Sequence, residues 1–508
     1  MTKPGFVYLV GAGPGDAGLL TLRGAEALGR AEVVLYDALV NPQLLSHAPA
    51  TAEFIFGGKR GGGRKISQDE LNTILVDRAR AGKVVVRLKG GDPYVFGRGG
   101  EEAEVLAKAK LPFEVVPGVS SFVAVPNYAG IPLTHRKYAS RITLATGHEA
   151  PDADKDAVDW AQLAKTPGTK VIMMGTERVE QIAGTLVEHG MPATTPVAMI
   201  QWGTTARQRS IAGTLADIGK TAARERIGPP TVVVVGEVVS LRDELNWFEL
   251  RPLFGKRVVV TRTREQASQL SLRLRDLGAE TLEIPTIKLD HPSDRQNLVD
   301  ALLELNSYDW LVFTSPNGVT RFFDYFFRQF KDMRDLGGAR IAAVGPATAK
   351  ALRDFHLQVD LMPEEAVGIK IAAAFKKFET IENLKICLLR AEVANQDLPL
   401  ALEGLGAIVD DVACYRTEPQ TDDPTGSAAL LAEEGADWIT FTSGSTVENF
   451  HARFDLPKIV GRFPKMRLAS IGPETSKALA DLGLKPSVEA REHTIEGLIK
   501  AITGITAR

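Results

Sequence analysis

The feature that most restricts the fold of this 508-residue chain is a regular alternation of short β-rich runs with helix-like segments. The runs, each bounded by glycine, proline or polar residues, include VYLVGAG, AEVVLYD, KVVVRLKGG and TVVVVGEVV. Between them, segments such as SQDELNTILVDRARAG repeat apolar residues at three and four positions, as a helix with one buried face does. In that segment, Ser67 followed by Glu70 predicts a capping box. The alternation predicts an α/β fold with mostly parallel sheets, which bind ligands at the carboxyl ends of their strands.

Composition excludes several classes of protein. The length predicts three or four domains, and 44% hydrophobic with 24% charged residues excludes wholesale disorder. A formal net charge of -3 gives no global positive field, so we expect neither nucleic acid nor a membrane as partner. No long apolar run or signal peptide is evident, which predicts a soluble protein. Two cysteines without C-x-x-C spacing, Cys387 and Cys414, predict a cytoplasmic location and no metal site.

A break in the pattern occurs at residues 246–257, NWFELRPLFGKR. A strand-rich unit ends with TVVVVGEVV, a charged stretch with proline and glycine follows, and a new strand begins at Arg257. We therefore predict one domain over residues 1–245, a linker over residues 246–255 and a second domain over residues 256–508.

The C-terminal half contains an internal repeat. DWLVFTSPNGVTRFF from Asp309 resembles DWITFTSGSTVENF from Asp437, an offset of 437 − 309 = 128. IAAVGPATAKAL from Ile341 resembles LASIGPETSKAL from Leu468, an offset of 468 − 341 = 127. A nearly constant offset of this length indicates two similar α/β lobes and not a solenoid array. Two lobes of this kind commonly bind a ligand between them.

Two glycine-rich segments of the N-terminal half leave their roles open. GAGPGD does not match the dinucleotide fingerprint, because Asp16 stands where the third glycine would be and Pro14 lacks an N–H. It fits a tight strand-to-helix turn equally well. In KGGDPYVFGRGGEE the glycines permit close approach of the backbone to a ligand. Asp92 in that segment either accepts hydrogen bonds from a ligand or is an ordinary turn residue, and His135 and His148 are interpreted as structural.

Together these segments resemble the uroporphyrinogen-III C-methyltransferases of the tetrapyrrole methylase family. The resemblance covers nearly all of residues 5–245 and rests on GAGPGDAGLLT, AEVVLYD, GGKR, RLKGGDPYVFGRGGEE, VVPGVSS, YAGIPLTHR, MMGT and GPPTVVVVGEVV. It implies two α/β subdomains, at about residues 1–117 and 118–245, and a homodimer formed through this half. It also implies a site for S-adenosylmethionine, formed by Pro14, Gly90, Gly91, Asp92, Val95, Ser120, Ser121, Met174 and Gly203.

The resemblance also implies two catalytic residues, Asp37 as proton acceptor and Lys59 as proton donor. Their chemistry suits the reaction, because methylation of a pyrrole carbon requires a proton to leave and a carboxylate is a fitting acceptor. A sulfonium methyl group is already activated, so the enzyme mainly supplies proximity and orientation. Lys59 and Arg60 fit the carboxylates of a uroporphyrinogen, but they also fit an ordinary solvated loop.

The C-terminal half shows no Ser-His-Asp set, metal cluster or phosphate loop. Its candidate substrate-binding groups, including Arg264, Ser315 and Thr475, follow strands or begin helices, where helix capping explains them as well as carboxylate binding does. From about residue 255 to 503 the chain resembles uroporphyrinogen-III synthase. The resemblance implies one lobe of residues 256–288 plus 420–508 and another of residues 289–419. It further implies that Tyr415 protonates the leaving hydroxyl of hydroxymethylbilane.

These observations predict a bifunctional enzyme that makes uroporphyrinogen III and methylates it twice to precorrin-2, for sirohaem or cobalamin synthesis. The fusion of consecutive steps also raises the hypothesis that the intermediate is channelled. Two alternatives stay open. In the first alternative, the methyltransferase half acts on a later corrin intermediate or on a protein histidine. In the second, the C-terminal half is a non-catalytic two-lobed binding module.

Overall fold

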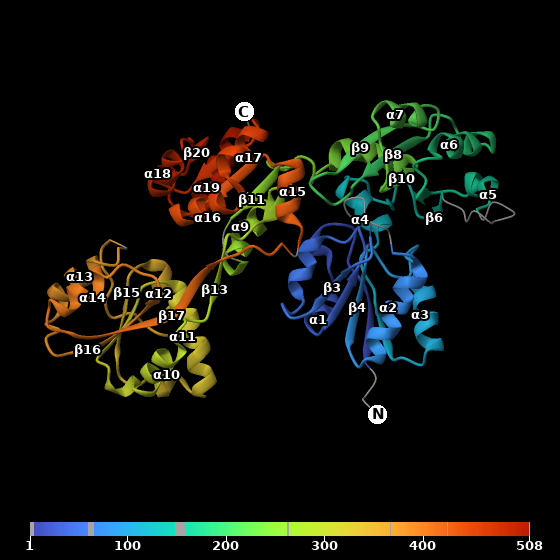
Figure 1. Cartoon of the computed structure of the whole chain (residues 1–508). Coiled ribbons are helices and arrows are strands. Elements are labelled where there is room, and N and C mark those ends of the chain that lie inside the picture. Colours follow the sequence, from blue (N-terminus) through green and yellow to red (C-terminus); the bar gives the residue numbers. More distant parts are fainter. Residues whose placement is uncertain are drawn as a thin grey trace. The chain divides into compact units, whose positions relative to one another are not determined.

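The structure, a computed structural model, describes residues 5–58, 66–147, 158–261, 264–365, 367–423 and 425–506, without the side chains of 264–268 and 506. By compactness the chain divides into Met1–Ile284 with Asp422–Arg508 as one unit and Pro285–Thr421 as the other. The described residues form four five-stranded sheets with helices packed against them (Figure 1). The predicted α/β class is confirmed. No described helix is long and apolar enough to cross a membrane.

The first sheet is entirely parallel, in the order β3-β2-β4-β1-β5. Its strands are β1 (Phe6–Gly11), β2 (Val33–Tyr36), β3 (Glu53–Phe56), β4 (Val84–Lys89) and β5 (Phe113–Val116). Alternate residues of these strands face α1 (Leu22–Gly29) on one side and α2 (Gln68–Arg80) with α3 (Gly99–Lys108) on the other (Figure 1). The predicted capping box at Ser67 and Glu70 starts α2 and is confirmed.

The second sheet, in the order β6-β7-β10-β8-β9, departs from the predicted parallel arrangement. Its strands are β6 (Ile142–Thr146), β7 (Thr169–Met173), β8 (Pro196–Gln201), β9 (Arg209–Thr214) and β10 (Thr231–Val235). Only β6 and β7 pair in parallel. The short connection from β8 to β9 explains the antiparallel pairing of these two strands, because antiparallel neighbours need only a hairpin whereas parallel ones need a long crossover. Helix α4 (Ser121–Tyr128) covers one face, and α5 (Trp160–Lys165), α6 (Val179–Glu188) and α7 (Ile218–Arg224) cover the other.

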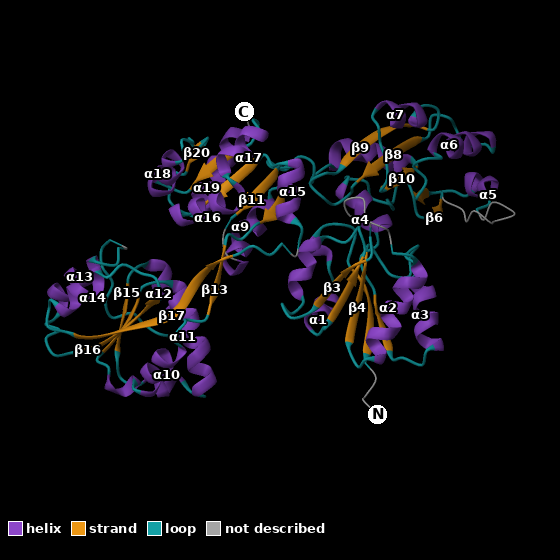
Figure 2. Cartoon of the chain, viewed as in Figure 1, coloured by secondary structure: helices purple, strands orange, loops and turns teal. Residues whose placement is uncertain are grey.

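The other two sheets confirm the internal repeat, with helices on both faces of each (Figure 2). In one copy β14 (Trp310–Phe313) leads into α11 (Pro316–Gln329), and β15 (Arg340–Ala343) into α12 (Pro346–Asp354). In the other, the corresponding elements are β18 (Trp438–Phe441), α16 (Gly444–Phe454), β19 (Arg467–Ser470) and α18 (Pro473–Asp481). The similar sequence segments therefore form the same strand–helix pairs.

The sheet of the repeat copy in the first unit takes strands from both chain segments of that unit, in the order β12-β11-β18-β19-β20. Its remaining elements are β11 (Arg257–Val260), α9 (Arg264–Asp276), β12 (Glu280–Glu283), α15 (Ser427–Glu434), α17 (Leu456–Arg462), β20 (Val488–Glu489) and α19 (Ile495–Thr506). The second unit carries the sheet β13-β17-β16-β14-β15. Its remaining elements are β13 (Ile287–Asp290), α10 (Arg295–Leu303), α13 (Lys370–Phe378), β16 (Lys385–Ala391), α14 (Asp397–Glu403) and β17 (Ile408–Pro419).

Residues 246–255, which follow α8 (Arg242–Leu245), pack closely against the rest of the first unit. The carboxylate of Glu249 accepts hydrogen bonds from Gln208 Nε2 at 2.8 Å and Ser210 Oγ at 2.6 Å, and it also pairs with Arg242. Leu253 is fully buried, and its N–H donates to the Leu277 carbonyl oxygen at 2.8 Å. This segment is therefore held by both charged and apolar contacts.

We expect Glu249→Gln to destabilise the protein at neutral pH. Burial raises the pKa of Glu249, but the hydrogen bonds from Gln208, Ser210 and Arg242 outweigh it and hold the pKa below its ordinary value of 4.5. A lowered folded-state pKa stabilises the fold above pH 4.5, and this stabilisation is lost as the pH falls further.

The variant should lose about 2 kcal/mol of unfolding free energy at pH 7, with the difference shrinking below about pH 4.5. Urea unfolding at both pH values measures this. Glu244→Gln changes an exposed glutamate of α8 and is the control. Equal stability of the two variants at pH 7 would contradict the expectation.

Candidate active site

A cavity of about 960 Å³ lies in the first unit, where the loops after β1, β4, β7 and β8 meet. The turn after β1 and the loop after β4 are hydrogen-bonded to each other. Gly13 N donates to Gly91 O at 3.2 Å, and Gly91 N donates to Gly13 O at 2.7 Å. GAGPGD and KGGD therefore form one wall of a single cavity, at the carboxyl ends of two parallel strands.

The cavity brings together every residue that the sequence predicted for the cofactor site. All nine line it: Pro14, Gly90, Gly91, Asp92, Val95, Ser120, Ser121, Met174 and Gly203. They come from four separate loops and the start of α4. Their convergence is the main geometric feature of the site.

Glycines allow the backbone segments beside the cavity to approach one another. A Cβ atom on Gly118 would lie 2.3 Å from Gly91 O and 2.7 Å from Gly11 Cα. Gly91 has a φ of 69°, which side chains rarely adopt. Three strand-end loops therefore meet at a distance that no larger residue permits.

Several cavity residues carry backbone strain. Phe96, Met174, Trp202 and Thr204 have φ values of 51°, 55°, 51° and 68°. Non-glycine residues seldom occupy this left-handed region unless the surrounding structure holds them there, and such residues cluster at functional sites. The loops after β4, β7 and β8 are thus fixed in conformations that present their backbone to the cavity.

Asp92 lines the cavity and also binds the backbone on either side of it. Its Oδ1 accepts from Tyr94 N at 2.8 Å and its Oδ2 accepts from Gly118 N at 3.0 Å. Both oxygens therefore hold backbone, one in their own loop and one in the loop after β5. The turn-residue interpretation describes what the carboxylate does in this structure.

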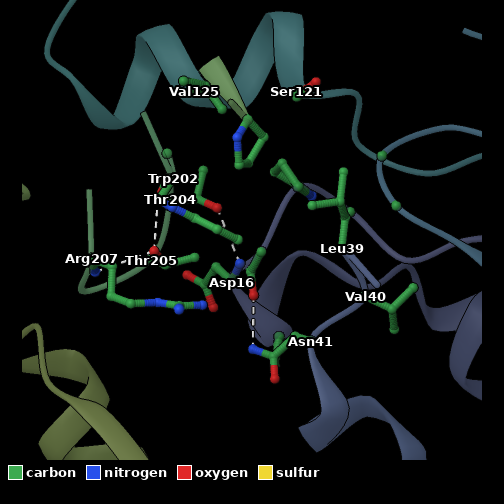
Figure 3. Close-up of a pocket in the computed structure, with 18 of the residues that line it drawn as sticks. Asp16, Leu39, Val40, Asn41, Ser121, Val125, Trp202, Thr204, Thr205 and Arg207 are labelled. Atoms are coloured by element: carbon green, nitrogen blue, oxygen red, sulfur yellow. Dashed lines mark hydrogen bonds between the residues drawn. The ribbon is translucent and has the colours of Figure 1, made fainter. Parts of the chain in front are cut away.

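Sequence reasoning missed a polar link between the loop after β1 and the loop after β8, which Figure 3 shows at the cavity. Asp16 N donates to Thr204 Oγ1 at 3.1 Å, and Tyr128 OH donates to Asp16 Oδ2 at 2.7 Å. Burial, followed by the hydrogen bond to Asp16, raises the pKa of Tyr128 above its ordinary value. Asn41 Nδ2 donates to Gly15 O at 2.8 Å (Figure 3). The residues lie up to 188 positions apart, so no local sequence signal indicates these contacts.

Arg207 was also missed and places a cation at the cavity. Its guanidinium lies 4.4 Å from the centre of the Trp202 ring, and both residues line the cavity (Figure 3). A guanidinium stacked on an aromatic face keeps its charge and its donors, which suit carboxylates.

Asp37 follows β2, directly between two residues that line the cavity, Tyr36 and Ala38. Its side chain is 32% exposed, and Arg87 Nη2 donates to its Oδ1 at 2.6 Å. The carboxylate is thus partly open to solvent and bound to a buried cation. Lys59, predicted as its proton-donating partner, lies outside the described residues.

In the second unit, two residues predicted for the synthase reaction lie together. Tyr415 OH and Ser315 Oγ are 3.1 Å apart, and Ser315 Oγ also accepts from Gly318 N at the start of α11. Tyr415 is 7% exposed, and burial raises the pKa of its phenol despite the hydrogen bonds from Ser315 and Asn317. The phenol therefore stays protonated at neutral pH.

The remaining predicted synthase residues belong to the first unit. Thr475 lies in α18 and is 2% exposed. Arg264 is the first residue of α9, but its side chain lies outside the described part. Across the residues that the structure describes, no group of three or more His, Cys, Asp or Glu side chains is arranged to hold a metal ion.

Comparison with known proteins identifies a protein family for each half of the chain. Residues 7–219 match the family of tetrapyrrole (corrin/porphyrin) methylases, and residues 268–500 match uroporphyrinogen-III synthase HemD. A porphyrin biosynthesis protein HemD of Ruminiclostridium josui is 38% identical over 502 residues, covering 99% of this chain and 98% of that protein. The chain belongs to this family. It is a bifunctional enzyme of tetrapyrrole biosynthesis, in which a C-methyltransferase is fused to a uroporphyrinogen-III synthase.

Two further relatives match the methyltransferase half of this family member. An S-adenosyl-L-methionine-dependent uroporphyrinogen III methyltransferase of Methanosarcina barkeri is 52% identical over 47% of this chain and 94% of that protein. A crystal structure of uroporphyrin-III C-methyl transferase from Thermus thermophilus, complexed with S-adenyl homocysteine, is 39% identical, with a TM-score of 0.40. It covers 46% of this chain and 93% of that one.

Gly118→Ala should destabilise the methyltransferase half, because its Cβ would overlap the Gly91 carbonyl. Overpacking of this kind costs about 1–3 kcal/mol in unfolding free energy. Gly100→Ala in α3 is a matched control, because its Cβ would meet nothing within 4 Å. Gly100 is the second residue of α3, so its replacement by alanine should be neutral or gain less than the roughly 1 kcal/mol expected in a helix interior. Thermal unfolding compares the two, and equal midpoints would refute the close approach.

Proposed function

We propose that the C-terminal half closes hydroxymethylbilane to uroporphyrinogen III and that the N-terminal half methylates this product twice, giving precorrin-2. The observation that carries the proposal is the single cavity formed by nine residues from five chain segments. The families that match each half support the same two reactions. We further propose a homodimer formed through the methyltransferase half, a cytoplasmic location and no requirement for a metal ion.

The cavity suits S-adenosylmethionine, which when bound supplies an activated methyl group. The glycines that follow β4 leave room for a ligand directly against the backbone. Gly90, Gly91, Met174 and Gly203 would hold it, largely through main-chain groups that the strained loops present. Because the loops are fixed in advance, little conformational entropy is lost when a ligand is oriented for transfer.

The chain's own residues would then bind the substrate's carboxylates and transfer protons. Uroporphyrinogen carries eight carboxylates, and Arg207 at the cavity suits one of them. Asp37 would receive the proton that the tetrapyrrole loses from another position once the ring carbon has been methylated, since its partly exposed carboxylate follows a strand beside the cavity. Lys59 would return a proton.

In the synthase half, Tyr415 would protonate the hydroxyl that leaves the linear tetrapyrrole. A phenol with a raised pKa keeps its proton at neutral pH, and Ser315, whose Oγ lies 3.1 Å from the phenol oxygen, would hold that oxygen in place. Pyrroles expel hydroxide readily, so holding the chain in a folded conformation would contribute more than acid catalysis does. This explains why few reactive side chains are needed.

One incubation of the purified protein with hydroxymethylbilane and S-adenosylmethionine tests the proposal. We expect precorrin-2, and uroporphyrinogen III when S-adenosylmethionine is left out. Product identity is read from the absorption spectrum and mass. Uroporphyrinogen I in both reactions would refute the synthase assignment, and uroporphyrinogen III without added methyl groups would refute the methyltransferase assignment.

Two substitutions should separate the activities. Asp37→Ala should slow methylation at least about 100-fold and leave cyclisation unchanged, since general base catalysis contributes that much or more. Tyr415→Phe should slow cyclisation about tenfold and spare methylation, because loss of hydroxide needs only modest assistance. Tyr308→Phe removes another buried hydroxyl of the second unit, which donates to Asp410, and is the control for Tyr415→Phe. Equal losses in both tyrosine variants would argue against a special role for Tyr415.

A further inference from the structure

Three charged residues form a buried cluster beside Asp37. Arg87 and Lys89 of β4 are 2% and 3% exposed, and Glu102 of α3 is fully buried. Glu102 Oε1 accepts from Arg87 Nε at 3.1 Å and from Lys89 Nζ at 2.9 Å. Arg87 joins this cluster to Asp37, which alone among the four is partly exposed.

The cluster occupies a place where an apolar core would normally continue. Val85, two residues before Arg87, packs into the apolar core beneath α2 and α3. Alternate residues of a strand share a face, so Arg87 and Lys89 extend that face toward the cavity. Desolvating charges costs several kcal/mol per ion, and apolar residues of similar volume often give equal or greater stability. A purely structural purpose therefore explains these charges poorly.

The geometry directs the Arg87 guanidinium at one carboxylate. Its Nε is bound to Glu102, and its Nη1 lies 3.4 Å from the Leu35 carbonyl oxygen. These contacts fix the plane of the guanidinium, so that Nη2 points at Asp37 Oδ1. A planar fork can be fixed in this way, whereas a lysine ammonium offers a single point charge.

We propose that Arg87 is a positioning residue for Asp37, held in place by Glu102, and that it orients the carboxylate that accepts the proton during methylation. The inference rests on the proposed function of Asp37. Arg87 would act through Asp37, because it is itself buried and is not among the residues that line the cavity. Binding one carboxylate oxygen to a rigid donor fixes the direction of the other, and proton transfer depends steeply on this geometry.

Lys89 pairs with the same glutamate as Arg87, which restricts the substitutions that can be made in the cluster. Burial, and next the charge of Arg87, lower the pKa of Lys89, while Glu102 raises it. Loss of Glu102 would therefore leave two buried cations without their shared counter-charge. For this reason Arg87 is the better position for a test than Glu102.

The test measures methylation of uroporphyrinogen III by the full chain carrying Arg87→Met, Arg87→Lys, Asp37→Ala or both Asp37→Ala and Arg87→Met. We expect Arg87→Met to lower kcat about 100-fold, while the affinity for S-adenosylhomocysteine, measured by calorimetry, changes less than about threefold. Arg87→Lys should recover about tenfold of that loss, because it restores charge without the fork. Cyclisation should be unchanged in every variant.

The double variant distinguishes positioning from a structural role. If Arg87 acts through Asp37, adding Arg87→Met to Asp37→Ala should lower kcat no further. Losses that multiply would overturn the proposal, as would wild-type kcat in Arg87→Met. If circular dichroism shows that Arg87→Met does not fold, Arg87→Lys becomes the deciding variant. We expect it to have about a tenfold lower kcat and an unchanged affinity for S-adenosylhomocysteine. A wild-type kcat in Arg87→Lys would overturn the proposal.

Two controls distinguish a failure of the positioning role of Arg87 from a failure of the proposed proton-accepting role of Asp37. Arg23→Met removes an exposed arginine that pairs with Glu26 and Glu114, and it should leave kcat unchanged. If Asp37→Ala abolishes methylation and Arg87→Met does not impair it, only the positioning role fails. If Asp37→Ala retains full methylation, the proposed role of Asp37 fails, and the positioning role fails with it.

Discussion

The cavity of the methyltransferase half depends on two backbone hydrogen bonds, exchanged between Gly13 and Gly91. They tie the loops that follow two adjacent parallel strands, β1 and β4, and so bring together motifs that are 78 positions apart (91 − 13). Gly118 adds a third segment at a distance that excludes any side chain. With these loops fixed, the strained residues that follow β7 and β8 line another part of the cavity. Catalysis by orientation requires such a rigid cavity more than it requires reactive groups.

The sequence predicted the components of this cavity well and their connections poorly. The lining residues lie in glycine-rich segments after strands, and parallel sheets place such segments at one edge. Asp16, Tyr128 and Thr204 escaped notice because their hydrogen bonds join positions 112 and 188 residues apart. The repeat predicted matching lobes because like segments form like strand–helix pairs. The mixed second sheet was not predicted, since the periodicity of a strand does not reveal the direction of its neighbour.

Buried charge is what sequence patterns reveal least. In VVVRLKGG, Arg87 and Lys89 interrupt an apolar strand, and each long side chain could reach solvent at the strand's end. Only the fold shows that α3 brings Glu102 over them and that Asp37 stands at the open side. The cost of desolvating these groups is met by mutual pairing, which also fixes their orientation. The same interactions that make the cluster tolerable therefore make it rigid.

The segment joining the two enzymes bears on how channelling can be studied. Phe248 packs 4.8 Å from the ring of Tyr128, which also holds Asp16 at the cavity, and Leu253 is buried in the core of the synthase sheet. Cutting the chain near Leu253 would therefore disturb an apolar core and the contacts that shape the methyltransferase cavity. A fall in overall flux after such a cut would have two physical causes, so only preserved flux would be decisive. A sharper comparison lengthens the chain at exposed Leu250 and leaves Phe248 and Leu253 in place.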